Sequence, residues 1–183
     1  MHLVHGMLGQ TGFRLLNAPT FLPAYLLLLS GGSDLAVGLG LALQSLGNML
    51  TPLFGASLIE HRKRVLPITF LAGGAMRLSV LGIAVSGLLF EPRVAILWIF
   101  AWLLVFGLCS GMQQVTFSFL MSKVIPVNMR GRLTGLRNFL AGITSAAVAM
   151  AGGTYLLGAQ PDAEGYSYTF ILAFVLTATG MLS

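Results

Sequence analysis

Polar side chains that could bind a solute lie inside long apolar runs of this sequence. Arg77 is 13 residues from Arg64 and 14 from Glu91, so a helix would place it about 20 Å from either end of its run. A guanidinium keeps its charge at that depth and must face the protein interior, where it finds acceptors. We therefore expect Arg77 to be either a substrate or gating residue or a structural arginine bound to helix carbonyls and amides.

Amide side chains recur in two other apolar runs. Gln44, Asn48 and Pro52 follow one another at intervals of four residues, and Gln113 and Gln114 are adjacent. An amide that faced lipid would have no hydrogen-bond partner, so these side chains should face protein or a watery cavity. Hydrogen bonding between helices and lining of a cavity are both open interpretations.

Membrane-spanning helices must position these residues, because the composition excludes a soluble domain. Of the 183 residues 56% are hydrophobic and 8% are charged, whereas about a quarter of a soluble domain is charged. A membrane-spanning helix needs roughly 20 mostly apolar residues. Six runs come near that length, and we predict one all-α bundle of six transmembrane helices over residues 1–183, with spans at 13–31, 35–59, 66–90, 94–121, 134–157 and 167–183.

Charged residues between the runs predict the topology. Arg62, Lys63 and Arg64 fill the turn after the second run, and Arg130 and Arg132 follow the fourth. Short loops rich in Lys and Arg stay in the cytoplasm, so residues 60–65 and 122–133 should be cytoplasmic, as should both chain ends. We expect a multi-pass protein of the plasma or inner membrane. The net charge of +5 then reflects topology and contact with anionic lipid, not nucleic-acid binding.

Proline and glycine spacing predicts how the spans bend and pack. Pro19 and Pro23 lie four residues apart and should bend or locally open the first span. Gly107 and Gly111 form a small-xxx-small pair that lets another helix approach closely. The fifth run should present a similar smooth face, made of Gly142, Ser145, Ala146, Ala149, Gly152 and Gly153.

Two features indicate a larger assembly. The sixth run is about four residues short of a comfortable span and has no Lys or Arg at its cytoplasmic end. We therefore expect the sequence to be a fragment, or one half, of something longer. In addition, a basic turn follows the second span of the set of spans one to three, and another follows the first span of the set of spans four to six. Inverted repeats require this alternation.

Six spans with both ends inside, and a basic turn after the second, resemble the amino-terminal half of a major facilitator superfamily transporter. The turn motif is formed by Gly55, Glu60 and the cations Arg62, Lys63 and Arg64. Glu stands here where the family has Asp, it falls one residue later, and the family's second glycine is absent. Residues 126–132, PVNMRGR, are similar to the Pro...Arg-Gly-Arg stretch that the family has after its fourth span.

The resemblance implies secondary-active transport of a small solute by alternating access. The six helices would be built of 3+3 inverted repeats, and the solute would bind between this half and a second six-helix half. The resemblance implies no cofactor, metal or nucleic-acid partner. A cytoplasmic gate would contain Gly55, Glu60, Arg62, Lys63, Arg64 and Arg130. The substrate pathway would be lined by Asn17, Gln44, Asn48, Arg77, Gln113 and Gln114. Span five matches only the terminal glycine pair of the family's antiporter motif, so we do not assign a drug antiporter.

Two other classes of protein compete with a carrier. A six-helix sensor or interaction module without transport activity would need an appended soluble partner, which this sequence does not contain. A membrane enzyme is suggested by Gly55-Ala56-Ser57, similar to the serine motif of rhomboid proteases. That chemistry needs a histidine base, and His2, His5 and His61 lie outside the spans; we expect no enzyme.

The distribution of titratable groups leads to one further expectation. All five acids and all three histidines lie at loops, span ends or the amino terminus, whereas proton-coupled carriers use a titratable group within the membrane. Arg77 cannot lose its proton. We expect Arg77 to attract an anionic group of the substrate or a carboxylate of the second half, and any proton-binding residue to belong to that second half.

Overall fold

The computed structural model describes residues 2–17, 21–60, 65–124, 126–158 and 161–182. Its elements are α1 (His2–Asn17), α2 (Phe21–Leu29), α3 (Asp34–Glu60), α4 (Leu66–Leu89), α5 (Pro92–Val124), α6 (Val127–Gly152), the π-helix η1 (Gly153–Leu157) and α7 (Ala163–Leu182). These described ranges contain no strand, which confirms the all-α prediction.

Four stretches of the described chain are long and apolar enough to cross a membrane: Gly9–Leu29, Leu66–Leu89, Pro92–Lys123 and Met129–Leu157. They coincide with the predicted spans one, three, four and five. The predicted span 35–59 lies in α3, and residues 167–182 of the last predicted span lie in α7; both helices are absent from these four stretches. The chain thus has several helices compatible with a membrane protein.

Helix boundaries differ from the predicted spans where polar residues flank an apolar run. α1 begins at His2, 11 residues before the first run, and α7 begins at Ala163. α5 ends at Val124 and α6 begins at Val127, so the expectation of a loop over residues 122–133 is wrong for most of that segment. Hydropathy marks where a chain becomes apolar, whereas a helix continues through polar residues that face water or protein.

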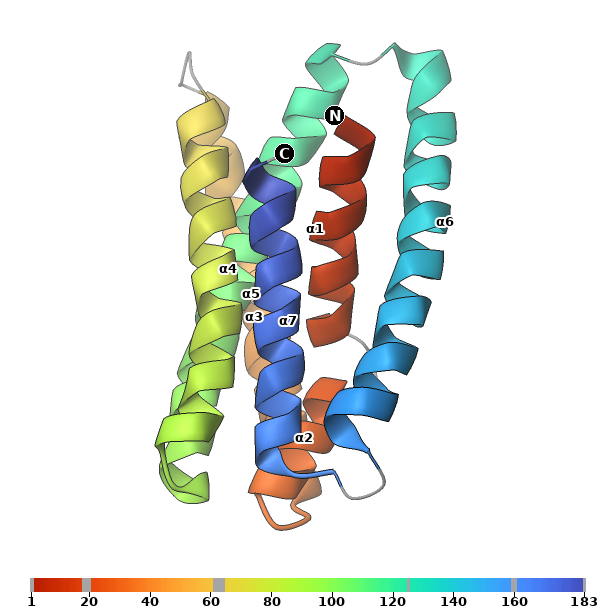
Figure 1. Cartoon of the computed structure of the whole chain (residues 1–183). Coiled ribbons are helices and arrows are strands. Elements are labelled where there is room, and N and C mark those ends of the chain that lie inside the picture. Colours follow the sequence, from red (N-terminus) through yellow and green to blue (C-terminus); the bar gives the residue numbers. More distant parts are fainter. Residues whose placement is uncertain (1, 18–20, 61–64, 125, 159–160, 183) are drawn as a thin grey trace.

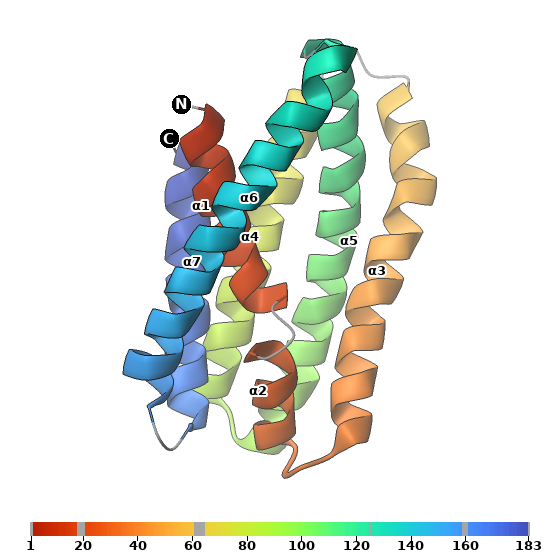
Figure 2. The same cartoon turned by 90° about the vertical axis from the view of Figure 1, so that its right-hand side faces the viewer.

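The first predicted span consists of two helices. α1 ends at Asn17 and α2 begins at Phe21, and Pro19 lies outside the described residues. Pro23 is the third residue of α2, in the first turn, where a backbone amide needs no acceptor within the helix. Figure 2 shows α1 tilted relative to α2, so the chain changes direction between them.

Neighbouring long helices pack in the order α3, α5, α4, α7, α1, α6, and α2 packs against α1, α3, α5 and α7. The long helices α1, α3, α4, α5, α6 and α7 alternate in direction along the chain, and α2 continues in the general direction of α1 (Figure 1). α3 ends and α4 begins at the end of the bundle where α1 begins and α7 ends, and the passage from α5 to α6 lies there too. The turns after α2, α4 and η1 lie at the opposite end. The end of α3 and the starts of α4 and α6 therefore lie at one end of the bundle, and the turns after α2 and α4 lie at the other.

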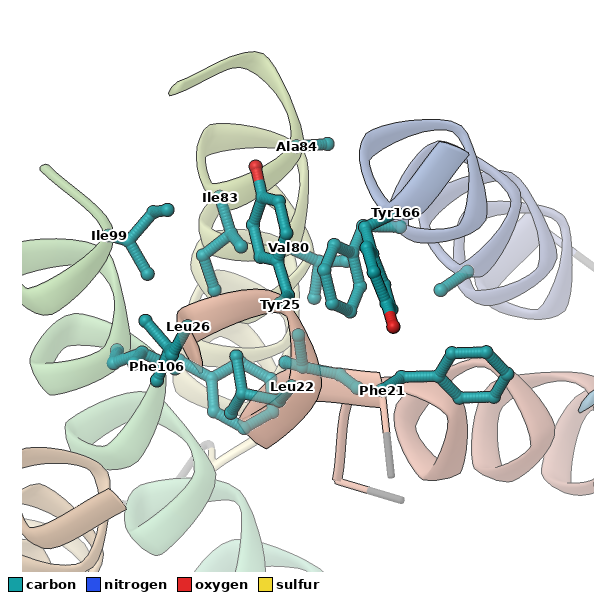
Figure 3. Close-up of a cluster of buried hydrophobic side chains, with 14 of the residues drawn as sticks. Phe21, Leu22, Tyr25, Leu26, Val80, Ile83, Ala84, Ile99, Phe106 and Tyr166 are labelled. Carbon is teal, nitrogen blue, oxygen red and sulfur yellow. The ribbon is translucent and has the colours of Figure 1, made fainter. Parts of the chain in front are cut away.

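A buried aromatic cluster fastens α2 to α7 and α4 (Figure 3). The Tyr25 ring is fully buried and lies 5.6 Å from the ring centre of Tyr166 and 5.4 Å from that of Phe170. Its hydroxyl lies 3.1 Å from the Ser167 hydroxyl, which satisfies both polar groups in an apolar setting. On α4 a side chain at Gly87 would overlap the Tyr25 hydroxyl, so glycine makes room for the ring.

Glycines bring α3 and α5 into backbone contact. A Cβ atom on Gly107 would overlap the Gln44 carbonyl, and one on Gly111 would lie 2.8 Å from the Asn48 carbonyl oxygen. From the other helix, a Cβ atom on Gly47 would lie 2.7 Å from the α5 backbone. This confirms the predicted small-xxx-small contact and assigns α3 as its partner.

The small residues of α6 make no comparable contact within the described chain. A Cβ atom on Gly142 would lie 3.3 Å from an Arg14 guanidinium nitrogen, and one on Gly152 would lie 3.8 Å from the Thr169 methyl group. Gly153 has no such neighbour within 4 Å. The glycines of the predicted smooth face of the fifth span therefore do not meet another backbone, whereas Ala149 of that face packs against the core cluster.

Candidate functional site

Arg77 is buried where α4 meets α7 and α1, with 7% of its surface exposed. Its Nε donates to the Thr177 carbonyl of α7 at 2.8 Å, and its Nη1 donates to the Gly73 carbonyl of α4 at 2.7 Å. The guanidinium carbon lies 5.3 Å from the centre of the Phe13 ring of α1, a cation–π distance. Of the two interpretations of Arg77, these contacts favour the structural one.

Gln113 faces α4 close to the Arg77 guanidinium. A Cβ atom on Gly73 would lie 3.1 Å from Arg77 Nη1 and 3.7 Å from both the oxygen and the nitrogen of the Gln113 amide. The buried Oε1 of Gln113 has no hydrogen-bond partner among the described residues. Glycine at position 73 thus leaves space in which an arginine and an amide from different helices approach one another.

Gln114 faces α3 instead. Its Nε2 donates to Asn48 Oδ1 at 3.4 Å in an exposed position. Adjacent residues of a helix point about 100° apart, so Gln113 and Gln114 contribute to different interhelical contacts. Gln44 lies one turn before Asn48, with its carbonyl against Gly107. The structure therefore divides the predicted pathway residues into an α3–α5 group and an Arg77–Gln113 group.

The predicted gate residues are only partly described. Arg62, Lys63 and Arg64 lie outside the described residues, as do the side chains of Glu60 and Asn17, the last residues of α3 and α1. Gly55 packs on α5, where a Cβ atom would lie 3.2 Å from the Met112 sulfur. Arg130 Nη2 donates to the Ser122 carbonyl at 2.8 Å, which joins the start of α6 to the end of α5.

A second polar group, on α1 and α6, was not singled out by the sequence analysis. With the Gln10 amide oriented as an acceptor, its oxygen lies 2.6 Å from Nη2 and 3.0 Å from Nε of Arg137. The opposite orientation would donate to Asn138 Oδ1 at 3.3 Å but would turn an NH₂ group towards two guanidinium donors. We assign the first orientation, since guanidinium nitrogens only donate.

Further contacts between α1 and α6 lie next to this group. The hydroxyls of Thr11 and Thr144 are 2.6 Å apart. The Arg14 guanidinium lies beside Gly142, as described above, and is half-buried. Gln10, Arg14 and Asn17 are spaced four and three residues apart, so they occupy one face of a helix. That spacing was the signal in the sequence that could have identified the group.

Arg137 also reaches α5. Its guanidinium carbon lies 4.6 Å from the centre of the Phe117 ring, and its side chain is half-buried. α1, α5 and α6 therefore meet around two arginines, Arg14 and Arg137, which we call the arginine pair. The five acids of the chain lie elsewhere, at helix ends and turns, at Asp34, Glu60, Glu91, Asp162 and Glu164.

An apolar hollow of about 540 Å³ lies between α3, α4 and α5. None of the predicted pathway residues lines it. Its walls are formed by Leu50, Thr51, Ile68, Leu71, Ala72, Ala75, Leu108, Cys109 and Met112. With one hydroxyl among these side chains, the hollow offers little to orient a polar solute.

Comparisons with known proteins return no relative: no protein-family model, no curated protein and no solved structure matches the chain. The resemblance to one half of a major facilitator superfamily transporter therefore stays a prediction.

Proposed function

We propose that the chain is half of a membrane carrier that moves a small solute by alternating access, together with a second six-helix half. The observation that carries this proposal is the order of helix packing. When α1–α2, α3 and α4 are compared with α5, α6 and α7, each major contact has a counterpart. α3 packs on α5 as α6 packs on α1, and α4 packs on α5 as α7 packs on α1.

The direction of the helices supports the same proposal. α1 begins at the end of the bundle where α7 ends, and it runs towards the opposite end (Figure 1). α5 runs in the reverse direction. α3 and α6, and α4 and α7, are likewise opposed. Three helices related to three others in opposite orientation are the arrangement of inverted repeats, which in carriers place the solute site near the membrane midplane between the repeats.

Polar residues lie on α1 and α5, the first helices of the two proposed repeats. Gln10 and Arg14 are on α1, and Gln113 and Gln114 are on α5. Polar groups in apolar helices line protein contacts or watery paths. A solute path along these two helices would explain why these polar side chains are present, since helix packing does not require them.

The proposal is tested by access to Gln114 from the two sides of the membrane. Gln114→Cys is made in a Cys109→Ala background, which removes the single cysteine of the chain, and is treated with a membrane-impermeant maleimide in vesicles of both orientations. A carrier should let the reagent react from either side. Lys123→Cys and Arg93→Cys, at opposite ends of α5, are the controls and should each react from one side only.

One-sided labelling of Gln114→Cys in both vesicle orientations would contradict alternating access. It would favour the six-helix sensor or interaction module, which has no reason to open the same residue to both compartments.

A further inference from the structure

The arginine pair differs from Arg77 in how its charge is accommodated. Arg77 is bound by two backbone carbonyls from two helices. Arg137 has an amide oxygen and an aromatic ring as neighbours, and the guanidinium of Arg14 lies against a glycine. None of these neighbours carries a negative charge.

The two guanidinium groups of the pair project from adjacent helices. Arg137 contacts Gln10 of α1. Arg14 follows Gln10 by one helical turn, a rise of about 6 Å along the axis of α1. Both helices contribute to stretches apolar enough to span a membrane, Gly9–Leu29 and Met129–Leu157. Arg14 is the sixth residue of the first stretch and Arg137 the ninth of the second. Two like charges in such a setting repel one another unless an anion lies between or beside them.

Guanidinium chemistry indicates the kind of anion. Arginine presents planar pairs of N–H donors that match the oxygens of a carboxylate or a phosphate, and such hydrogen bonds are stronger than neutral ones. The pair therefore has donors suited to an oxyanion and no carboxylate of its own helices to receive them.

We infer that Arg14 and Arg137 form a binding site for a carboxylate or phosphate group, and that the solute carried by this protein is an anion. This inference rests on the carrier proposed above. It moves the recognition of negative charge from Arg77, where the sequence suggested it, to the seam between α1 and α6. Gln10 positions Arg137 by accepting from its Nη2 and Nε.

The experiment measures anion binding without transport. The full chain is purified in nonionic detergent, and its unfolding temperature is followed as sodium phosphate replaces sodium chloride at equal ionic strength. Phosphate should raise the unfolding temperature, because a ligand that binds the folded state stabilises it. A second arm adds phosphatidylglycerol or phosphatidylcholine to the detergent. A response to phosphate identifies a free anion as ligand, and a response to phosphatidylglycerol alone identifies a lipid headgroup and contradicts the anionic solute.

Variants test whether the arginine pair is the site. Arg14→Gln and Arg137→Gln should each weaken phosphate binding by about 10- to 100-fold, the loss of one charge-assisted hydrogen bond or more. Arg93→Gln is the matched control, since Arg93 is exposed at the opposite end of the bundle, and should bind as the parent does. Equal binding in all three variants, or no phosphate response in a parent that unfolds cooperatively, would overturn the site.

Lysine variants cover the case in which a glutamine variant does not fold. Arg14→Lys and Arg137→Lys keep the charge but lose the planar fork, so each should bind phosphate measurably more weakly than the parent. Parent-like binding in both would refute the site. The result is separable from the carrier proposal: phosphate binding with one-sided labelling of Gln114→Cys retains the site and rejects transport, and the reverse combination rejects only the site.

Discussion

The contact of α3 with α5 is made by glycines, and the contact of α1 with α6 is made by side chains, although the two contacts occupy equivalent places in the packing order. In each pair the two helices run in the same direction (Figures 1 and 2). α3 and α5 touch through glycines at positions 47, 107 and 111, with backbone against backbone. α1 and α6 are joined by side chains, among them the hydroxyls of Thr11 and Thr144.

The difference shows how one arrangement of helices supports two purposes. Glycine removes the side chains that would hold helices apart, so dispersion contacts extend along the backbone. Polar side chains keep helices further apart and hold hydrogen-bond donors between them. In the proposed anion site the solute would bind at the α1–α6 contact, whereas the α3–α5 contact joins its two helices by close backbone packing.

The largest effect should come from breaking the glycine contact. Gly47→Ala should destabilise the protein by about 1–3 kcal/mol, because the added methyl group would push α3 and α5 apart. Gly38→Ala, on the same helix, meets nothing within 4 Å and should be neutral or stabilising by up to about 1 kcal/mol, since glycine is the poorer helix former. Unfolding by sodium dodecyl sulfate in mixed micelles measures both. Equal stability of the two variants would mean that the contact is not close.

A smaller effect is expected at Arg77. Two charge-assisted hydrogen bonds contribute about 1.5–3 kcal/mol each, and a guanidinium at the centre of a membrane-spanning helix, where we expect Arg77, would cost about 2.5–3.5 kcal/mol. Arg77→Gln should therefore lower the free energy of unfolding by a net amount of about 1–2 kcal/mol.

Arg77→Gln should also leave the stabilisation by phosphate unchanged, whereas Arg137→Gln should reduce it. The same unfolding measurement, with and without phosphate, checks both expectations. If Arg77→Gln lost the phosphate response while remaining folded, Arg77 would belong to the anion site and the distinction between the two arginine environments would fail.

The smallest effect concerns the hydroxyl contact of α1 with α6. A double-mutant cycle of Thr11→Val and Thr144→Val should give a coupling energy of about 0.6 kcal/mol, as for other hydrogen bonds between membrane helices. A cycle of Thr11→Val with Thr179→Val is the control and should give none, because the Thr179 hydroxyl donates to carbonyls of its own helix. Equal coupling in the two cycles would indicate that the Thr11 and Thr144 hydroxyls do not interact.

The order of apolar runs was readable from the sequence because burial in lipid is a local property of each run. The predicted limits 35–59 and 66–90 agree with α3 and α4 to within a residue at each end. The spacing of Gly107 and Gly111 likewise predicted a close helix contact, since small residues one turn apart lie on the same face of a helix. The extension of α5 to Val124 and the start of α6 at Val127 were missed because hydropathy falls there while hydrogen bonding within the two helices continues.

Only the tertiary structure decided which polar side chains meet. The sequence gives Gln113 and Gln114 the same chemistry, but α4 lies beside one and α3 beside the other. It gives Arg77, Arg14 and Arg137 the same charge, but two carbonyls lie beside Arg77, whereas Gln10 and Phe117 lie beside Arg137 and Gly142 lies beside Arg14. The physical reason is that a helix fixes the direction of each side chain from local spacing, whereas the acceptor of its hydrogen bond comes from another helix. For Arg77 that acceptor is Thr177, 100 residues away in the sequence.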